Sequence, residues 1–118
     1  MHNYKEMKIW QKGRMLVKEI YQLTQKFPSD ERFGLTSQTR RAAVSIPSNI
    51  SEGAGRGTDK DFSHFLDMAR GSVNEVETLI FLANDLEYIS IEELNNLILK
   101  TEELGKMIIS FQSKLSSI

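Results

Sequence analysis

The chain has 118 residues, enough to bury one hydrophobic core but too few for two domains. Apolar residues make up 40% and charged residues 26%, as in a typical soluble globular protein, and no apolar run approaches the roughly 18 residues of a membrane span. The absence of cysteine excludes disulfides, thiolate nucleophiles and cysteine metal centres. The N-terminus shows no secretory signal pattern, so we expect a cytoplasmic protein with one domain over residues 1–118.

Charge is divided unevenly along the chain. Residues 1–58 hold ten Lys and Arg against five Asp and Glu, whereas residues 59–118 hold five against eleven. This asymmetry is typical of a nucleic-acid-binding face, and equally of two complementary surfaces that meet in an oligomer. The sequence pI of about 6.1 favours the second interpretation slightly, because dedicated nucleic-acid binders usually have a pI above about 9.

Two helices are predicted in the first half of the chain. Residues 4–27 show apolar positions at alternating spacings of four and three, ended by Pro28; they are Ile9, Gly13, Leu16, Ile20, Leu23 and Phe27. Residues 36–53 form the second helix, with Pro47 inside its apolar pattern. Because the pattern resumes at Ile50, we expect a kink at Pro47 rather than a break.

Two capping-box sequences mark helix starts in the second half. Thr58 with Asp61 precedes a helix predicted over residues 59–88, and Ser90 with Glu93 precedes one over residues 91–116, whose apolar pattern runs to Ile118. The links between helices are short, so successive helices should be antiparallel neighbours. The sequence therefore predicts an all-α protein, an antiparallel up-down-up-down four-helix bundle.

Metal and phosphate sites are incomplete in this sequence. Asp61 and His64 have the spacing of a metal-ligand pair, but a di-iron bundle needs that pair on two helices, and the other histidine is His2 near the N-terminus. The glycines of residues 53–57 precede a helix, as in a phosphate-binding loop. Asp59 stands where such a loop needs lysine, so we expect a hairpin without a cofactor or a metal ion.

Residues 48–52 are the remaining candidate for acid–base chemistry. Ser48 has no neighbouring histidine base and Glu52 no carboxylate partner, so Asn49 and Glu52 are expected to hydrogen-bond the helix end and the loop. We therefore expect a protein that is not an enzyme and has no small-molecule substrate.

Two groups of surface residues are candidates for binding. Five cations are candidates for nucleic-acid contacts, because each points away from an apolar helix face, flanks such a face or lies in the glycine loop. They are Arg14, Lys18, Arg40, Arg41 and Arg56. Large apolar residues outside the predicted core are candidates for self-association, although scattered surface aromatics would look the same; they are Trp10, Val17, Tyr21, Phe81 and Tyr88.

Several long segments carry a family resemblance. They are Trp10-Gln11-Lys12, Phe27-Pro28, Glu31-Arg32-Phe33-Gly34-Leu35-Thr36-Ser37-Gln38 and, most specific, Arg40-Arg41-Ala42-Ala43-Val44-Ser45-Ile46-Pro47-Ser48-Asn49-Ile50-Ser51-Glu52-Gly53. The likeness continues through residues 62–77 and 84–89, and the last helix is similar only in pattern. These segments resemble the 23S ribosomal RNA intervening-sequence proteins, also called four helix bundle proteins.

The resemblance implies a bacterial cytoplasmic protein that forms a homopentameric ring of four-helix bundles. Members are encoded in intervening sequences of 23S ribosomal RNA genes or stand alone in genomes. A related branch is the accessory variability determinant of diversity-generating retroelements, a basic barrel that binds reverse transcriptase and nucleic acid; this chain, at a net charge of −1, is nearly neutral instead. The resemblance assigns no catalytic or ligand residue.

These observations together favour a non-enzymatic ring that engages RNA or a nucleic-acid-bound protein. Cyclic symmetry repeats any modest basic patch once per subunit, which strengthens its attraction for phosphate. The alternative is a protein-interaction adaptor or a structural ring without direct nucleic-acid binding, in which the same cations attract the acidic helices of the next subunit. Both interpretations stay open at the level of the sequence.

Overall fold

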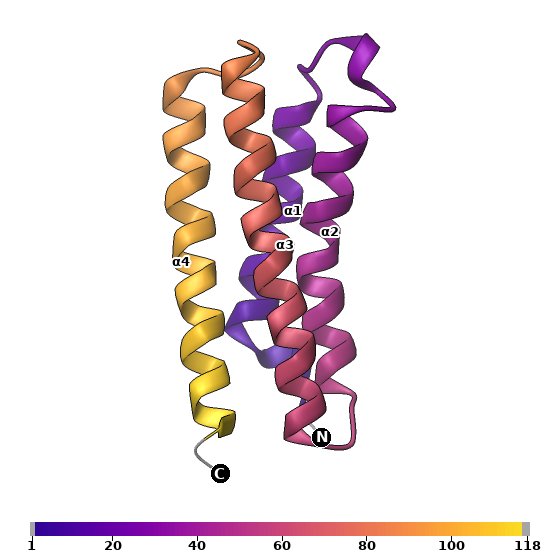
Figure 1. Ribbon diagram of the computed structural model, residues 1–118, viewed down its shortest axis with the longest axis vertical. Helices are drawn as coiled ribbons and strands as arrows, with labels where there is room; N and C mark the ends of the chain where they lie inside the picture. The colour runs from indigo at the N-terminus through magenta and orange to yellow at the C-terminus, as the bar shows by residue number, and fades with distance from the viewer. Residues whose placement is uncertain (1, 117–118) are drawn as a thin grey trace.

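The structure is a computed structural model that describes residues 2–116. Four α-helices run alternately up and down along an axis of 46 Å (Figure 1). They are α1 (Lys8–Thr24), α2 (Leu35–Ala54), α3 (Asp59–Asp85) and α4 (Ile91–Ser116), with 3-10 turns at Tyr4–Glu6 (η1) and Ser29–Glu31 (η2). The described residues contain no strand, which confirms the predicted all-α up-down-up-down bundle. The predicted apolar position at Ile118 lies outside the described residues.

Helix α1 is shorter than the predicted range of residues 4–27. It begins at Lys8 because Met7 is extended, with φ −80° and ψ 128°, and separates the helix from the turn η1. It ends at Thr24, before Phe27 and Pro28. A proline disfavours helical geometry in the residue that precedes it, so the chain has to leave the helix ahead of Phe27.

Helix α3 ends three residues before the predicted boundary at residue 88. Glu87 has a positive φ of 65°. The Tyr88 amide donates to the Ala83 carbonyl at 2.8 Å, and the Glu87 amide to the Asn84 carbonyl at 2.9 Å. This is the Schellman arrangement, in which glycine usually occupies the position of Glu87. The chain thus turns before Tyr88, so the prediction that Tyr88 is helical was wrong.

Helix α2 continues through Pro47 without interruption, and the proline ring is buried. The prediction that no helix boundary falls at this residue is confirmed, while the bend itself stays a prediction.

Both predicted caps occur. Thr58 Oγ1 accepts a hydrogen bond from the Asp61 amide at 3.1 Å. Ser90 and Glu93 form the reciprocal box: the Glu93 amide donates to Ser90 Oγ at 3.1 Å, and the Ser90 amide donates to Glu93 Oε1 at 2.8 Å. These bonds satisfy amides that the first turn of a helix otherwise leaves unpaired.

The helices pack unequally. Helices α2 and α3 pack against each other most extensively, whereas α1 and α4 touch much less. Two ion pairs tie α1 to α4, namely Lys12–Glu103 and Lys100–Glu19, and a third, Lys26–Glu93, ties the segment after α1 to α4. Larger side chains that are completely buried come from all four helices and include Ile20, Ile46, Ile50, Phe62, Leu66, Ile80, Leu104 and Ile108. The core therefore follows the apolar stripes of the sequence.

No helix within residues 2–116 is both long and apolar enough to cross a bilayer.

Candidate interaction groove between α1 and α2

A groove of about 440 Å³ lies between α1 and α2. Its α1 wall contains five of the residues singled out in the sequence, namely Trp10, Arg14, Val17, Lys18 and Tyr21. Its α2 wall consists of Val44, Pro47, Ser48 and Ser51. The structure thus brings together two groups that the sequence predicted separately, the apolar stripe and the outward cations of α1.

The aromatic wall of the groove is held by contacts within the protomer. The Trp10 ring packs edge-on against Tyr4, with ring centroids 5.0 Å apart. The guanidinium of Arg14 lies 4.9 Å from the centroid of the Trp10 ring. Behind this wall, a Cβ added at Gly13 would meet the ring of Pro47 at 3.5 Å, an ordinary contact distance, so the two helices are close here without crowding.

Arg40 does not line the groove but contacts Tyr21, which does. Its guanidinium lies 4.5 Å from the centroid of the Tyr21 ring, and its Nε donates to Thr24 Oγ1 at 2.8 Å. Its Nη2 donates to the Tyr21 carbonyl at 3.4 Å, in the last turn of α1, where a cation is favoured by the helix dipole. Arg40 therefore holds the Tyr21 ring and caps α1 through two of its N–H donors, and its contact with nucleic acid stays a prediction.

The groove has no acidic lining residue. Residues 32–51, which include nearly all of α2, contain no Asp or Glu. Among the described residues, Arg14, Lys18 and Arg41 have no carboxylate partner. Arg41 is exposed on α2 but is not among the groove residues. The groove thus presents aromatic surface and uncompensated positive charge together.

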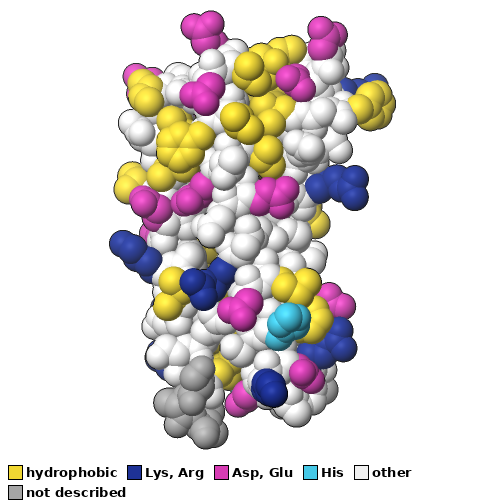
Figure 2. Space-filling view, in the orientation of Figure 1, with side chains coloured by type: hydrophobic (Ala, Val, Ile, Leu, Met, Phe, Trp, Pro, Cys, Tyr) yellow, Lys and Arg dark blue, Asp and Glu magenta, His cyan; other side chains and the backbone are white. Residues whose placement is uncertain are grey.

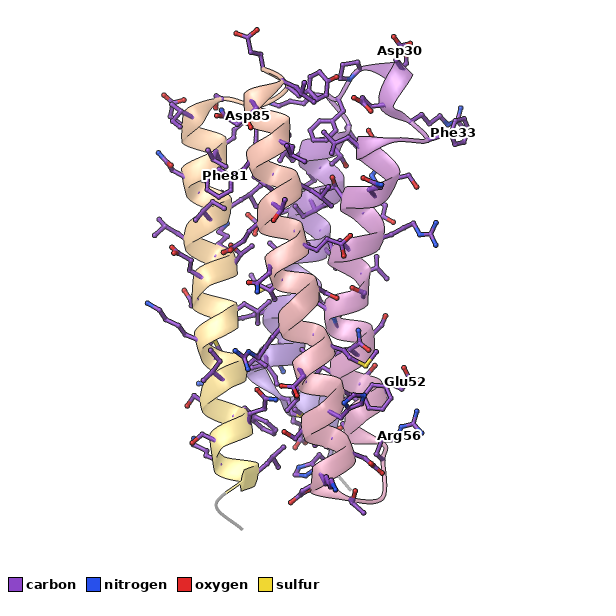
Figure 3. All side chains as sticks on the ribbon, viewed as in Figure 1. Asp30, Phe33, Glu52, Arg56, Phe81 and Asp85 are labelled. Carbon is purple, nitrogen blue, oxygen red and sulfur yellow. The ribbon has the colours of Figure 1, made fainter. Side chains whose placement is uncertain are left out.

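The other predicted residues lie elsewhere. Arg56 follows α2, and its Nη2 lies 3.5 Å from Glu52 Oε1 (Figure 3). The Arg56 guanidinium also lies 4.5 Å from the centroid of the Phe65 ring. Phe81 is on α3, with 48% of its side chain exposed. Tyr88 is half-buried at the end of the bundle, with its ring 5.5 Å from that of Phe27.

Tyr88 has a contact within the protomer that the sequence pattern did not reveal. Its hydroxyl donates to Glu31 Oε2 at 2.9 Å, and the Leu35 amide donates to Glu31 Oε1 at 3.0 Å. The Leu35 amide and the Tyr88 hydroxyl hold the pKa of the Glu31 carboxyl below its ordinary value, and the same carboxylate raises the pKa of Tyr88. Tyr88 therefore joins the loop before α2 to the α3–α4 turn.

Of the two polar contacts predicted at the end of α2, the structure confirms that of Glu52 and contradicts that of Asn49. Glu52 contacts the following loop through Arg56, as expected. Asn49 instead donates to the Ser45 carbonyl at 2.8 Å, inside the helix, so the prediction of a helix-end bond for Asn49 was wrong. Residues 2–116 contain no group of three or more His, Cys, Asp or Glu placed to hold a metal ion.

The α2 wall of the groove was missed by the sequence interpretation. Val44 and Ser51 follow Arg40 and Pro47 at helical spacing, and this pattern on one side of the predicted helix was the available signal. The groove residues contain no histidine or carboxylate to act as a general base. Their chemistry suits the binding of an anionic, partly aromatic or apolar surface.

The fold and the groove together define a small four-helix bundle with a basic, aromatic groove between α1 and α2. The sequence model of the 23S rRNA-intervening sequence protein family matches residues 5–110, and the chain belongs to this family. A crystal structure from Bacteroides thetaiotaomicron, described as a protein of unknown function from the S23 ribosomal protein family, is similar with a TM-score of 0.79. It is 25% identical, over 88% of this chain and 97% of that chain. Comparison with functionally curated proteins gave no match.

Proposed function

We propose that the protein is a non-enzymatic, homo-oligomeric module of the bacterial cytoplasm that associates with RNA. The observation that carries the proposal is the α1–α2 groove, where cations without a carboxylate partner flank the half-buried Trp10 and the exposed Tyr21, and no acidic residue lines the groove. Proteins that bind single-stranded nucleic acid combine a positive groove along the backbone with aromatic rings on which bases stack. The groove offers both on one surface.

Two cations and two rings have distinct roles in this proposal. Arg14 and Lys18 would contact phosphates, and Trp10 and Tyr21 would stack with bases. Arg41 adds positive charge on the exposed side of α2. Contacts of this kind are independent of sequence and weaken with salt, because phosphate binding releases condensed counterions.

Self-association would multiply these contacts. The resemblance to ring-forming proteins supports a homopentamer, in which each groove occurs five times around the ring axis if every subunit is equivalent. Light scattering on the purified protein tests this part directly. A mass of five protomers supports it, and a protomer mass of 13.5 kDa at tens of micromolar contradicts it.

Filter binding of a random single-stranded RNA pool across salt concentrations tests the RNA contact. The Arg14→Ala/Lys18→Ala variant should bind all sequences more weakly and flatten the log–log salt slope by about 1.4, since each lost phosphate contact on single strands accounts for about 0.7. Arg40 is left in place because it caps α1. Lys60→Ala/Lys106→Ala removes the same charge from exposed positions outside the groove and should bind like the wild type.

A second function is supported by the acidic half of the chain. Residues 71–99 contain six Asp and Glu and no Lys or Arg, a composition that repels RNA and suits a protein partner. In a protein adaptor or structural ring, the wild type would show no measurable affinity for the RNA pool at physiological salt. The same cation variant would then lower the mass of the assembly instead of an RNA affinity.

A further inference from the structure

The turn before α2 carries the most exposed large apolar side chain among the described residues. Phe33 is 88% exposed, and the guanidinium of Arg32 lies 5.3 Å from the centroid of its ring. Figure 3 shows Phe33 pointing sideways away from the bundle, whereas Asp30 in the same connection lies at the top of the molecule. The Phe33 ring adds nothing to the core of the protomer and is available to a partner. We call Arg32 and Phe33 the turn site.

The turn is braced although its tip is exposed. Glu31 Oε1 accepts a hydrogen bond from the Leu35 amide at 3.0 Å, and Glu31 Oε2 accepts one from the Tyr88 hydroxyl at 2.9 Å. A Cβ added at Gly34 would lie 2.7 Å from Glu31 Oε1, so glycine leaves the space that this carboxylate occupies. The charge of Glu31 is thus engaged within the protomer. Phe33 is held on a fixed turn, which lowers the entropy cost of binding a partner.

The surface that continues from the turn along α2 is basic. Residues 32–51 contain three arginines and no Asp or Glu. Arg32 and Arg41 are exposed, and neither has a carboxylate partner in the part of the chain that the structure describes. Arg41 lies one helical turn before Val44, a residue of the groove wall, and therefore on the same side of α2. Positive charge thus extends from the turn site to the groove.

The neighbouring side of the molecule is acidic. Figure 2 shows acidic side chains spread over the upper half of the side on which α3 and α4 lie, and basic side chains at its right edge. Residues 71–99, which include the end of α3 and the start of α4, contain six Asp and Glu and no Lys or Arg. A polyanion is repelled from this side and attracted to the α2 side.

We propose that the turn site is a second contact for single-stranded RNA, in which a base stacks on Phe33 and Arg32 contacts a phosphate next to that base. The proposal rests on the proposed function and extends it, since the same strand then follows α2 and enters the groove near Val44. An exposed aromatic ring beside a cation without a carboxylate partner is the combination that binds a base and its phosphate.

The surroundings of Phe33 favour RNA over a protein partner. A protein interface has an apolar centre of several residues. The partly or fully exposed residues that follow Phe33 on α2 before the groove include Ser37, Gln38 and Arg41, all of them polar. A single ring within a polar, basic surface suits a stacked base, because every base offers a flat face of similar size.

The spacing of the two contacts sets the length of the strand. Residues 35–51, from the turn to the far end of the groove, extend about 24 Å along α2 at about 1.5 Å per residue. A strand with one phosphate per roughly 3.4 Å needs about seven nucleotides to cover this length. The α1 wall of the groove, from Trp10 to Tyr21, is about 16 Å long and takes about five nucleotides.

Competition binding with RNA of two lengths tests the proposal. Random twelve-nucleotide strands reach both contacts, whereas four-nucleotide strands fill only the groove. Filter retention of a labelled twelve-nucleotide strand, with unlabelled four-nucleotide strands as competitor, gives both affinities. Phe33→Ala should weaken the long strand by about fivefold or more, the lower end of the range for a base stacked on an aromatic ring. It should leave the affinity of the short strand nearly unchanged.

Other substitutions of Phe33 separate stacking from a general apolar contact. Phe33→Trp should bind the long strand at least as tightly as the wild type, and Phe33→Leu should lose as much affinity as Phe33→Ala. Full affinity of Phe33→Leu would show that no base stacks there and overturn the proposal. Leu99→Ala is the control, because it shortens another exposed apolar side chain on α4 and should bind like the wild type. Both positions are exposed, so all variants should keep the helical circular dichroism of the wild type.

The remaining outcomes distinguish the turn site from the groove. If Phe33→Ala binds the long strand like the wild type while the wild type binds RNA, the turn site is wrong and the groove stays the RNA contact. Equal losses for long and short strands would place the effect of Phe33 in the groove and contradict a second contact. If the wild type binds neither length, the proposed function itself fails, and the turn site fails with it.

Discussion

Replacing Gly53 by alanine should destabilise the bundle, although alanine is the better helix former. Gly53 lies in the last turn of α2, against the first two turns of α3. A Cβ built there would lie 2.6 Å from Phe65 Cβ, 2.9 Å from Phe62 Cδ1 and 3.3 Å from the Phe62 carbonyl oxygen. The Phe65 Cβ atom is bonded directly to the backbone, and the Phe62 ring is buried, so neither can move away from an added methyl group.

The expected cost follows from two opposing effects. Alanine gains at most about 1 kcal/mol over glycine in helix propensity. Overpacking a tight core costs about 1–3 kcal/mol, and a clash with a Cβ and a backbone oxygen belongs at the upper end of that range. Gly53→Ala should therefore lower the free energy of unfolding by about 2 kcal/mol net.

Urea denaturation followed by circular dichroism measures this change. With a slope near 2 kcal/mol per M, the midpoint should fall by about 1 M. Gly71→Ala is the matched control, because a Cβ added at this exposed position of α3 meets nothing within 4 Å. It should raise stability by about 0.5–1 kcal/mol. Equal stabilisation by both substitutions would refute the close approach of α2 and α3 at Gly53.

Three further substitutions test other parts of the structure. Glu87→Gly should raise the free energy of unfolding by about 1 kcal/mol in urea denaturation, since glycine adopts a positive φ without strain; an unchanged midpoint would contradict the Schellman turn. Arg40→Ala should lower it by about 1 kcal/mol, and Arg40→Lys should restore little, because lysine cannot reproduce the bonds at the end of α1. Hydrogen bonds from Lys26 and Lys12 lower the pKa values of Glu93 and Glu103 respectively, so the folded chain binds fewer protons than the unfolded chain. Their stabilisation is therefore complete above the ordinary pKa of 4.5 and lost as the pH falls through the lowered values; Lys12→Gln should reduce this acid sensitivity in thermal melts, and an unchanged pH profile would contradict the ion pair.

The bundle was predictable because its caps and apolar stripes agree. Thr58 and Ser90 accept the expected hydrogen bonds, and the stripe through Ile46 and Ile50 continues on either side of Pro47. Local sequence carries this information, since capping and helical periodicity act over one or two turns. The start of α1 after Met7 and the end of α3 before Glu87 were not predictable in this way. They depend on the extended backbone of Met7 and the positive φ of Glu87, and neither residue type favours that conformation.

The sequence predicted the residues of the α1 wall of the groove but not those of the α2 wall. The spacing of Trp10, Val17 and Tyr21 indicated a second apolar stripe on α1, but which helix lies beside it is set by packing between distant segments. The same limit explains Arg40, whose bonds to the end of α1 span 16 and 19 positions. A helical projection places such a side chain outside the core without showing which neighbour it contacts.

Trp10 provides the most direct test of the claim that the α1–α2 groove is the binding surface for RNA. It is the only tryptophan of the chain and part of the groove wall, so its fluorescence reports on whatever covers the groove. Titration with single-stranded RNA at fixed protein concentration should change Trp10 emission in a saturable way, and the change should weaken as salt rises. The account is contradicted if RNA binds in a parallel filter assay while Trp10 emission stays constant, or if the protein retains no RNA at all.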